Sequence, residues 1–182
     1  MKCVLKILAL MAIPGMAAAG NCLPVVGTVR LDPEDCTKIN DYYKGQVLTF
    51  LGNNPQVYGP GPWCFKTTLK LLGFGTSTGY SGVTSESLNG YAPTPALAPS
   101  GQSILTARSW LPIPGTKDSY GQYTEIFASE IIIGSPNRVT EQSVIMKTNG
   151  KGIFKDINGG GFVILGDTRG REVPIQGEFC FP

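Results

Sequence analysis

The chain has 182 residues, a length typical of one domain, with fifteen basic residues, thirteen acidic residues and no histidine. The lack of histidine excludes Ser-His-Asp and Cys-His catalytic systems. The 24 glycines and 14 prolines exceed the usual share of about 12%, and with a hydrophobic fraction of 42% they indicate a turn-rich all-β protein rather than a disordered one.

Residues 1–19 have the features of an export signal. Lys2 and Lys6 form a basic start, an apolar run follows, and Ala17–Ala19 supply a small-residue cleavage site. The apolar run is too short to span a bilayer, which needs about 20 apolar residues. We therefore predict that residues 1–19 are a signal peptide and that the protein is secreted or periplasmic.

Removal of the signal leaves a single domain, residues 20–182, with thirteen basic and thirteen acidic residues. A neutral domain without a basic stripe is not expected to bind nucleic acid. Asn21 stands before Cys22, where a lipoprotein signal needs a small residue, so we expect no stable membrane anchor.

Four cysteines remain in this domain: Cys22, Cys36, Cys64 and Cys180. An even number in an exported chain indicates two disulfide bonds, each expected to stabilise the fold by about 2–4 kcal/mol. No pair has the close spacing of metal ligands, so we predict neither a metal nor another cofactor. Three connectivities are open, and we favour Cys22–Cys180 with Cys36–Cys64.

The first part of the domain predicts strands around one short helical segment. Pro33 and the acids beside it are typical of a helix start, with helical turns through Tyr43. In the strand Trp63–Leu72, alternate residues from Phe65 to Leu71 share one face. The predicted strands are Val25–Leu31, Gln46–Leu51, Trp63–Leu72 and Ser85–Leu88, with a flexible loop at Gly73–Gly79.

Five further strands follow at short spacing. In the strand Tyr120–Ile133, apolar residues occupy both faces. This indicates a barrel that is filled or lined inside and also packs outward. We therefore predict one all-β domain, an antiparallel barrel of about eight strands, with a homo-oligomer as one expected use of the outward face. The strands are Ser103–Leu111, Tyr120–Ile133, Val139–Lys147, Phe162–Gly166 and Glu172–Phe181.

A glycine-rich stretch links two of these strands. Asn149-Gly150 is a strong hairpin signal, and the positions that form its pattern are Gly150, Gly152, Phe154, Ile157 and Gly159. We expect Gly150 and Gly152 to adopt positive φ angles and Phe154 to be buried.

This pattern resembles the signature of the allene oxide cyclase and dirigent-type barrels, and the likeness covers about residues 102–166. It implies a calycin-like barrel, a trimer in related cyclases, and lumen chemistry on a lipophilic substrate. The chain departs from that signature at Lys151, where the family often has Thr, and at Ile157, where it often has Ala.

Candidate ligand-binding residues are Arg108, Trp110, Tyr123 and Glu125. The face of Ser103–Leu111 that carries Arg108 and Trp110 is the bulkier one, so we predict that it points into the barrel. An inward Arg needs a carboxylate or an anionic ligand, and Glu125 on the next strand is the predicted partner. A structural ion pair and a ligand site both remain open.

Four carboxylates are further candidates for general acid or base chemistry: Glu125, Glu130, Glu141 and Asp156. The expected function is binding of a small lipophilic ligand, or a structural or interaction role outside the cytoplasm. The alternative is a cyclase or isomerase that works in the barrel lumen, so whether the protein is an enzyme stays open. An open lumen with converging Arg and Glu would favour the enzyme, and a filled lumen the other roles.

Overall fold

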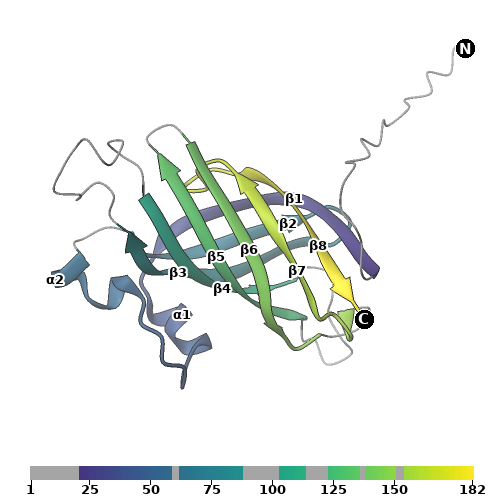
Figure 1. Cartoon of the computed structure of the whole chain (residues 1–182), viewed down its shortest axis with the longest axis horizontal. Coiled ribbons are helices and arrows are strands. Elements are labelled where there is room, and N and C mark those ends of the chain that lie inside the picture. The colour runs from purple at the N-terminus through teal and green to yellow at the C-terminus, as the bar shows by residue number, and fades with distance from the viewer. Residues whose placement is uncertain (1–20, 59–61, 88–102, 114–122, 136–137, 151–153) are drawn as a thin grey trace, which may run out of the picture.

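The computed structural model describes residues 21–58, 62–87, 103–113, 123–135, 138–150 and 154–182, so the predicted signal peptide and Gly152 lie outside the described residues. Eight antiparallel strands close into one barrel, because β1 pairs with β8 as well as with β2 (Figure 1). The strands are β1 (Asn21–Glu34), β2 (Cys64–Leu71), β3 (Gly75–Ser87), β4 (Ser103–Pro112), β5 (Glu125–Ser135), β6 (Arg138–Thr148), β7 (Gly159–Leu165) and β8 (Val173–Phe181). The predicted all-β barrel is confirmed.

The N-terminal predictions need three corrections. β1 continues to Glu34, so helix α1 (Thr37–Tyr42) begins later than predicted, because pairing with β2 extends the strand. Gln46–Leu51 is not a strand; η1 (Leu51–Asn53) and α2 (Pro55–Tyr58) follow it. The predicted loop Gly73–Gly79 instead contains the start of β3, whose residues 75–82 pair with β2.

The inward face of the barrel holds two apolar clusters separated by polar side chains. On β2, the predicted alternation is confirmed: Phe65, Thr67, Leu69 and Leu71 are all buried. Phe65 belongs to a small cluster near one end of the barrel, whereas Leu69 and Leu71 belong to a larger one that fills the rest. The buried Thr67 lies between the two clusters. Together these side chains fill the lumen of the barrel.

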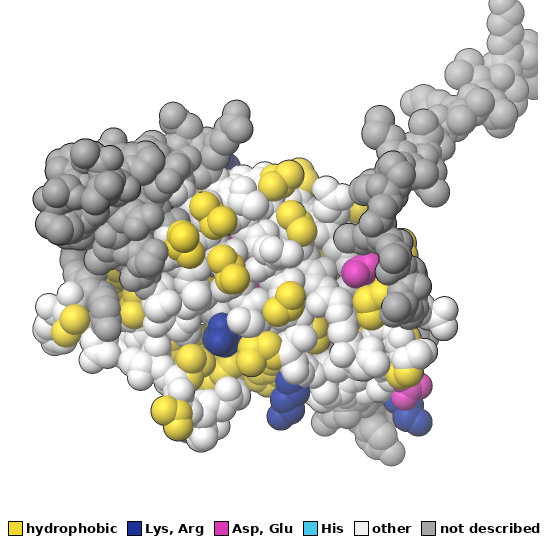
Figure 2. Space-filling model, viewed as in Figure 1, with side chains coloured by type: hydrophobic (Ala, Val, Ile, Leu, Met, Phe, Trp, Pro, Cys, Tyr) yellow, Lys and Arg dark blue, Asp and Glu magenta, His cyan; other side chains and the backbone are white. Residues whose placement is uncertain are grey.

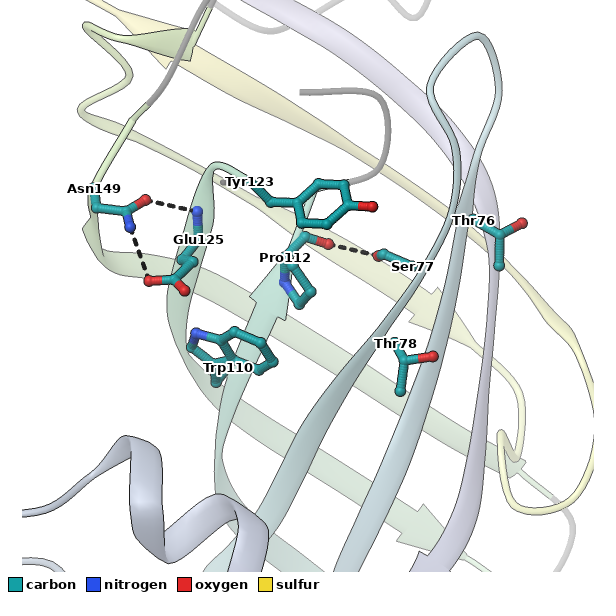
Figure 3. A pocket seen from close by; sticks show the side chains of 8 residues that line it. All are labelled: Thr76, Ser77, Thr78, Trp110, Pro112, Tyr123, Glu125 and Asn149. Carbon is teal, nitrogen blue, oxygen red and sulfur yellow. Dashed lines mark hydrogen bonds between the residues drawn. The ribbon is translucent and has the colours of Figure 1, made fainter. Parts of the chain in front are cut away.

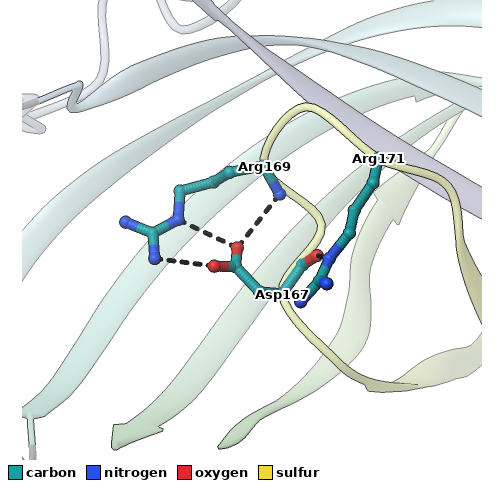
Figure 4. Close-up of polar contacts among 3 residues, drawn as sticks. All are labelled: Asp167, Arg169 and Arg171. Atoms are coloured by element: carbon teal, nitrogen blue, oxygen red, sulfur yellow. Dashed lines mark hydrogen bonds and ion pairs between the residues drawn. The ribbon is translucent and has the colours of Figure 1, made fainter. Parts of the chain in front are cut away.

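One end of the barrel is covered by the loop between β7 and β8. The Leu31 amide of β1 donates to the Thr168 carbonyl at 2.9 Å. Asp167 accepts bonds from the Arg169 amide (3.1 Å) and guanidinium (2.9 and 2.8 Å), and Arg171 Nε donates to the Asp167 carbonyl at 2.8 Å (Figure 4). This network fixes the loop on β1 and keeps Thr168 buried in the lumen wall.

The opposite end is closed by Phe154, which follows the glycine-rich turn. Its ring is fully buried, as predicted, and its centroid lies 5.5 Å from that of Phe74, 5.2 Å from Phe179 and 6.2 Å from Phe181. These rings come from the β2–β3 hairpin and from β8, so Phe154 joins distant parts of the chain into one plug.

The glycines around Phe154 are needed for close approach more than for turn geometry. Gly150 does not have the positive φ that we expected. A Cβ at Gly150 would instead lie 2.2 Å from the Phe154 carbonyl oxygen, so a side chain cannot fit there. Positive φ occurs at Gly160 (114°), where a Cβ would also meet the Glu178 carbonyl, whereas Gly159 has ordinary space.

The segment between β1 and β2 covers the outer wall of β3–β5. Tyr43 packs edge-on against Phe50 and Phe127, and its hydroxyl donates to the Ser109 carbonyl at 2.9 Å. Leu51 reaches the end of the lumen and packs with Phe65. The barrel therefore has a second apolar core on its outside.

Both favoured disulfides are confirmed. Cys22 and Cys180 lie opposite each other on β1 and β8, and Cys36–Cys64 fixes the start of the covering segment to β2. Two such bonds are typical of an extracytoplasmic protein. Among the described residues, the only group with clustered metal-ligand atoms is Cys22, Cys180 and Glu178, and two of its three ligand atoms are disulfide sulfurs.

The outer face of β5–β7 carries exposed aliphatic side chains, visible as separate yellow groups over these strands in Figure 2. This is the face that a homo-oligomer would use, and that expectation stays a prediction. Within the part of the chain that the structure describes, no helix has the length and hydrophobicity to cross a bilayer. The exposed side chains are Ile131, Ile133, Val144, Met146, Val163 and Leu165.

Candidate functional site

Two hollows of very different size lie among the described residues. A groove of about 760 Å³ lies on the outer wall where β3, β4 and β5 meet, and a cavity of about 20 Å³ lies inside the lumen. Sites for small molecules usually have volumes of about 300–1,000 Å³, while about 10–15 Å³ is enough for one water molecule. Of these two hollows among the described residues, the outer groove is the one with room for an organic ligand.

The apolar rings of the groove lie between polar side chains on its two sides (Figure 3). Trp110 and Pro112 come from β4, Tyr123 precedes β5, Glu125 begins β5, and Asn149 follows β6. Three hydroxyl side chains of β3 line the other side, and the Ser77 hydroxyl donates to the Pro112 carbonyl at 2.5 Å. These hydroxyl residues are Thr76, Ser77 and Thr78.

Asn149 holds Glu125 in place through two hydrogen bonds. The Glu125 amide donates to Asn149 Oδ1 at 2.7 Å, and Asn149 Nδ2 donates to the Glu125 carboxylate at 2.8 Å. The second carboxylate oxygen of Glu125 is not used by Asn149. In the sequence, Asn149 stands before Gly150 as a turn signal, and that pattern does not indicate its place in the groove.

Trp110 is the one described residue whose side chain has a polar atom with neither solvent contact nor a hydrogen-bond partner. Its ring is 8% exposed, stacks on Tyr42 at a centroid distance of 3.7 Å, and has an Nε1–H without an acceptor. Tyr42 is also close enough to Glu125 to interact with it electrostatically. Burial is the main cause that raises the pKa of Tyr42, and the charges of Tyr80 and Glu125 raise it further. An orphaned donor of this kind usually has a functional or structural explanation.

Arg108 is not in the lumen, so the predicted inward orientation of its face is wrong. The neighbours Ala107, Ser109 and Leu111 are buried inside the barrel, which puts Arg108 and Trp110 on the outer face. The bulk of that face packs under the segment between β1 and β2 instead of filling the lumen.

The predicted ion pair between Arg108 and Glu125 is also wrong. The register of β4 and β5 sets Arg108 opposite Ser129 and Glu125 opposite Pro112. Arg108 Nη1 donates to the Ser129 hydroxyl at 2.6 Å and to the Ala107 carbonyl at 2.9 Å. The groove thus brings together three of the four predicted ligand-binding residues, and Arg108 is outside its described lining.

We expect the stability effects of Arg108→Met and Glu125→Leu to be additive within about 0.5 kcal/mol. The two positions are four residue pairs apart along the sheet, about 13 Å at the usual rise per residue, and sites at that distance rarely couple. Urea unfolding of the two single variants and the double variant measures the coupling. A coupling energy of 2 kcal/mol or more would contradict this expectation, because it would show that Arg108 and Glu125 do form an ion pair.

The lumen cavity is bordered by a row of hydrogen-bonded hydroxyls. Ser81 Oγ lies 2.7 Å from Thr67 Oγ1 and 2.6 Å from Ser109 Oγ, so the row crosses β2, β3 and β4. Ser109 in turn bonds the carboxyl group of Glu130 on β5, and Glu141 on β6 lines the same cavity.

The four candidate carboxylates therefore have different environments. Glu130 and Glu141 are 5% and 7% exposed inside the barrel, Glu125 lies in the groove, and Asp156 is exposed after the Phe154 turn. Alternation along β5 grouped Glu130 with Ile126 and Ala128, but only the register of β5 and β6 brings the two inner carboxyls together.

Comparison of the chain with protein-family models, with curated proteins and with solved structures finds no match.

Proposed function

We propose that this chain is an exported binding protein that takes a small saccharide-like ligand in the groove on the outer wall of its barrel. The observation that carries the proposal is the groove of about 760 Å³ itself, in which the rings of Trp110, Pro112 and Tyr123 lie between hydrogen-bonding side chains.

The composition of the groove supports the ligand class. A sugar ring has an apolar face and a polar edge, which suit the rings of Pro112 and Tyr123 and the polar groups of Glu125 and Asn149. A purely lipophilic ligand would remove water from Glu125 and Asn149 without replacing it, at a cost of about 1–3 kcal/mol for each unsatisfied group. The groove therefore favours a hydroxyl-rich ligand over a lipophile.

The size of the lumen cavity weighs against the other expected functions. A lipophile or a cyclase substrate needs many times the volume of about 20 Å³ that the lumen offers. The resemblance to allene oxide cyclase and dirigent-type barrels then bears on the fold more than on the activity. The export signal in residues 1–19 remains part of this proposal, and the two disulfides are consistent with it.

We expect Glu125→Gln to weaken saccharide binding about 10- to 100-fold, because hydrogen bonds to a charged group contribute about 1.5–3 kcal/mol. Calorimetric titration of the mature protein with glucose, galactose, N-acetylglucosamine and their disaccharides measures the affinity. Glu34→Gln, at an exposed position on β1, is the matched control and should bind as the wild type does. Absence of binding across this panel, or equal affinities for both variants, would contradict the proposal.

A further inference from the structure

The lumen contains a pair of carboxyl groups that the groove does not use. Glu130 lies opposite Ser143 in the β5–β6 register, and Glu141 lies opposite Ile132, so the two glutamates are diagonal neighbours on the inner face. Diagonal neighbours have Cα atoms about 7–8 Å apart, within reach of long side chains. Both side chains line the cavity of about 20 Å³, which has room for about one water molecule.

No cation among the described residues enters the lumen beside this pair. Arg108 on β4 is the nearest cation that affects Glu130, but its guanidinium is on the outer face and is bonded to Ser129 and Ala107. Tyr43 also lies outside the wall, and its hydroxyl is bonded to the Ser109 carbonyl.

The remaining neighbours are uncharged. Glu130 has one bond, from Ser109, whereas Glu141 is 93% buried and has no hydrogen bond among the described residues. The other side chains around the cavity are hydroxyls or aliphatic and aromatic groups from β1, β2, β3, β4, β6, β7, β8 and the loop at Thr168. Each ionised carboxylate would cost several kcal/mol of desolvation here, and two of them would repel each other.

Burial accordingly raises the pKa of Glu130 to about 7, against weaker opposing effects of the Ser109 bond and Arg108. Burial, and then repulsion from Glu130, raises the pKa of Glu141 well above its ordinary range. In the unfolded chain both groups ionise near pH 4.5.

We propose that Glu130, Glu141 and the cavity between them form an internal proton-binding site, which holds two neutral carboxylic acids with one water and makes the folded barrel sensitive to rising pH. Above about pH 4.5 the folded state binds more protons than the unfolded state, so stability is greatest below that pH and is lost as pH rises toward 7 and beyond. The folding equilibrium constant falls up to tenfold per pH unit for each group, hence up to a hundredfold for the pair. The site is independent of the groove.

Urea unfolding of the oxidised mature protein at pH 5, 6, 7 and 8 tests this site. We expect wild-type stability to fall steadily over this range, and the double variant Glu130→Gln/Glu141→Gln, whose amides cannot ionise, to lose most of that slope. Glu34→Gln should keep the full slope. Asp167, whose pKa is lowered by its bond to Arg169, gives a slope of opposite sign at acidic pH and is present in every variant, so it cancels in the comparison.

Infrared spectroscopy and the addition of divalent cations test the same site if the double variant does not fold. At pH 6, the infrared spectrum of the wild type should contain carbonyl bands of buried protonated carboxyl groups that the single variants Glu130→Gln and Glu141→Gln each reduce. Absence of these bands, or a wild-type slope equal to that of the double variant, would overturn the site. Full recovery of wild-type stability at pH 8 by Ca²⁺ or Mg²⁺ would also overturn it, by showing that a metal cation rather than a proton is the occupant.

Discussion

Replacement of Phe154 by alanine is expected to lower the free energy of unfolding by about 3–5 kcal/mol, the usual cost of removing a fully buried Phe. The ring has no exposed surface and contacts Phe74, Phe179 and Phe181. Its loss leaves a cavity at the barrel end that the paired strands cannot close by collapsing, because their backbone hydrogen bonds hold them apart. Loss of this plug should therefore affect the whole barrel.

Chemical denaturation of the oxidised protein measures this effect, with Val47→Ala as the matched control. Val47 is fully exposed, so its truncation should change stability by no more than about 0.5 kcal/mol. Phe154→Leu should fall between the two. An unchanged unfolding midpoint for Phe154→Ala would mean that the segment after the glycine-rich turn does not close the barrel.

Removal of the Cys22–Cys180 bond by a double serine substitution is expected to cost about 5 kcal/mol. In the chain-entropy description, a bond stabilises by restricting the unfolded chain, and the restriction grows with the length of the closed loop. The separation here is 158 residues, compared with 28 for Cys36–Cys64. The same treatment gives about 3–4 kcal/mol for the shorter loop.

The two double variants, compared by urea unfolding under identical conditions, control for each other. Cys22–Cys180 joins β1 to β8 at the seam where the barrel closes, so its loss should also weaken that pairing. A larger loss of stability from Cys36→Ser/Cys64→Ser would contradict the loop-length argument. Such a result would mean that Cys36–Cys64 stabilises the protein mainly by keeping the segment between β1 and β2 packed against the barrel.

Patterns within single strands were the most predictable part of the fold. Alternation in β2 identified its buried residues, and the cysteine count together with the predicted export signal indicated two bonds, because both signals depend on local sequence or on simple parity. Gln46–Leu51 has strand-like composition but is not a strand, since β1 pairs directly with β2 and β8 and leaves it no partner in the barrel.

Orientation and contacts between strands were less predictable. Alternation showed that Arg108 shares a face with Trp110, but could not show that a covering segment makes the outer face as apolar as the inner one. The rule that the bulkier face points inward therefore failed at β4. Likewise, the Glu130–Glu141 pair and the Glu125–Asn149 contact join residues on different strands, and each depends on a register that one strand alone does not specify.

The central claim, that ligands bind at the outer groove and not in the lumen, is tested most directly by the fluorescence of Trp110. The chain has two tryptophans, so Trp63→Phe leaves Trp110 as the only indole. Titration of this variant with the saccharide panel should shift the emission of Trp110 saturably, because the ligand covers the part of the indole that lines the groove, while oleate should leave it unchanged. Saturable binding of oleate, with no response to any saccharide, would contradict the account.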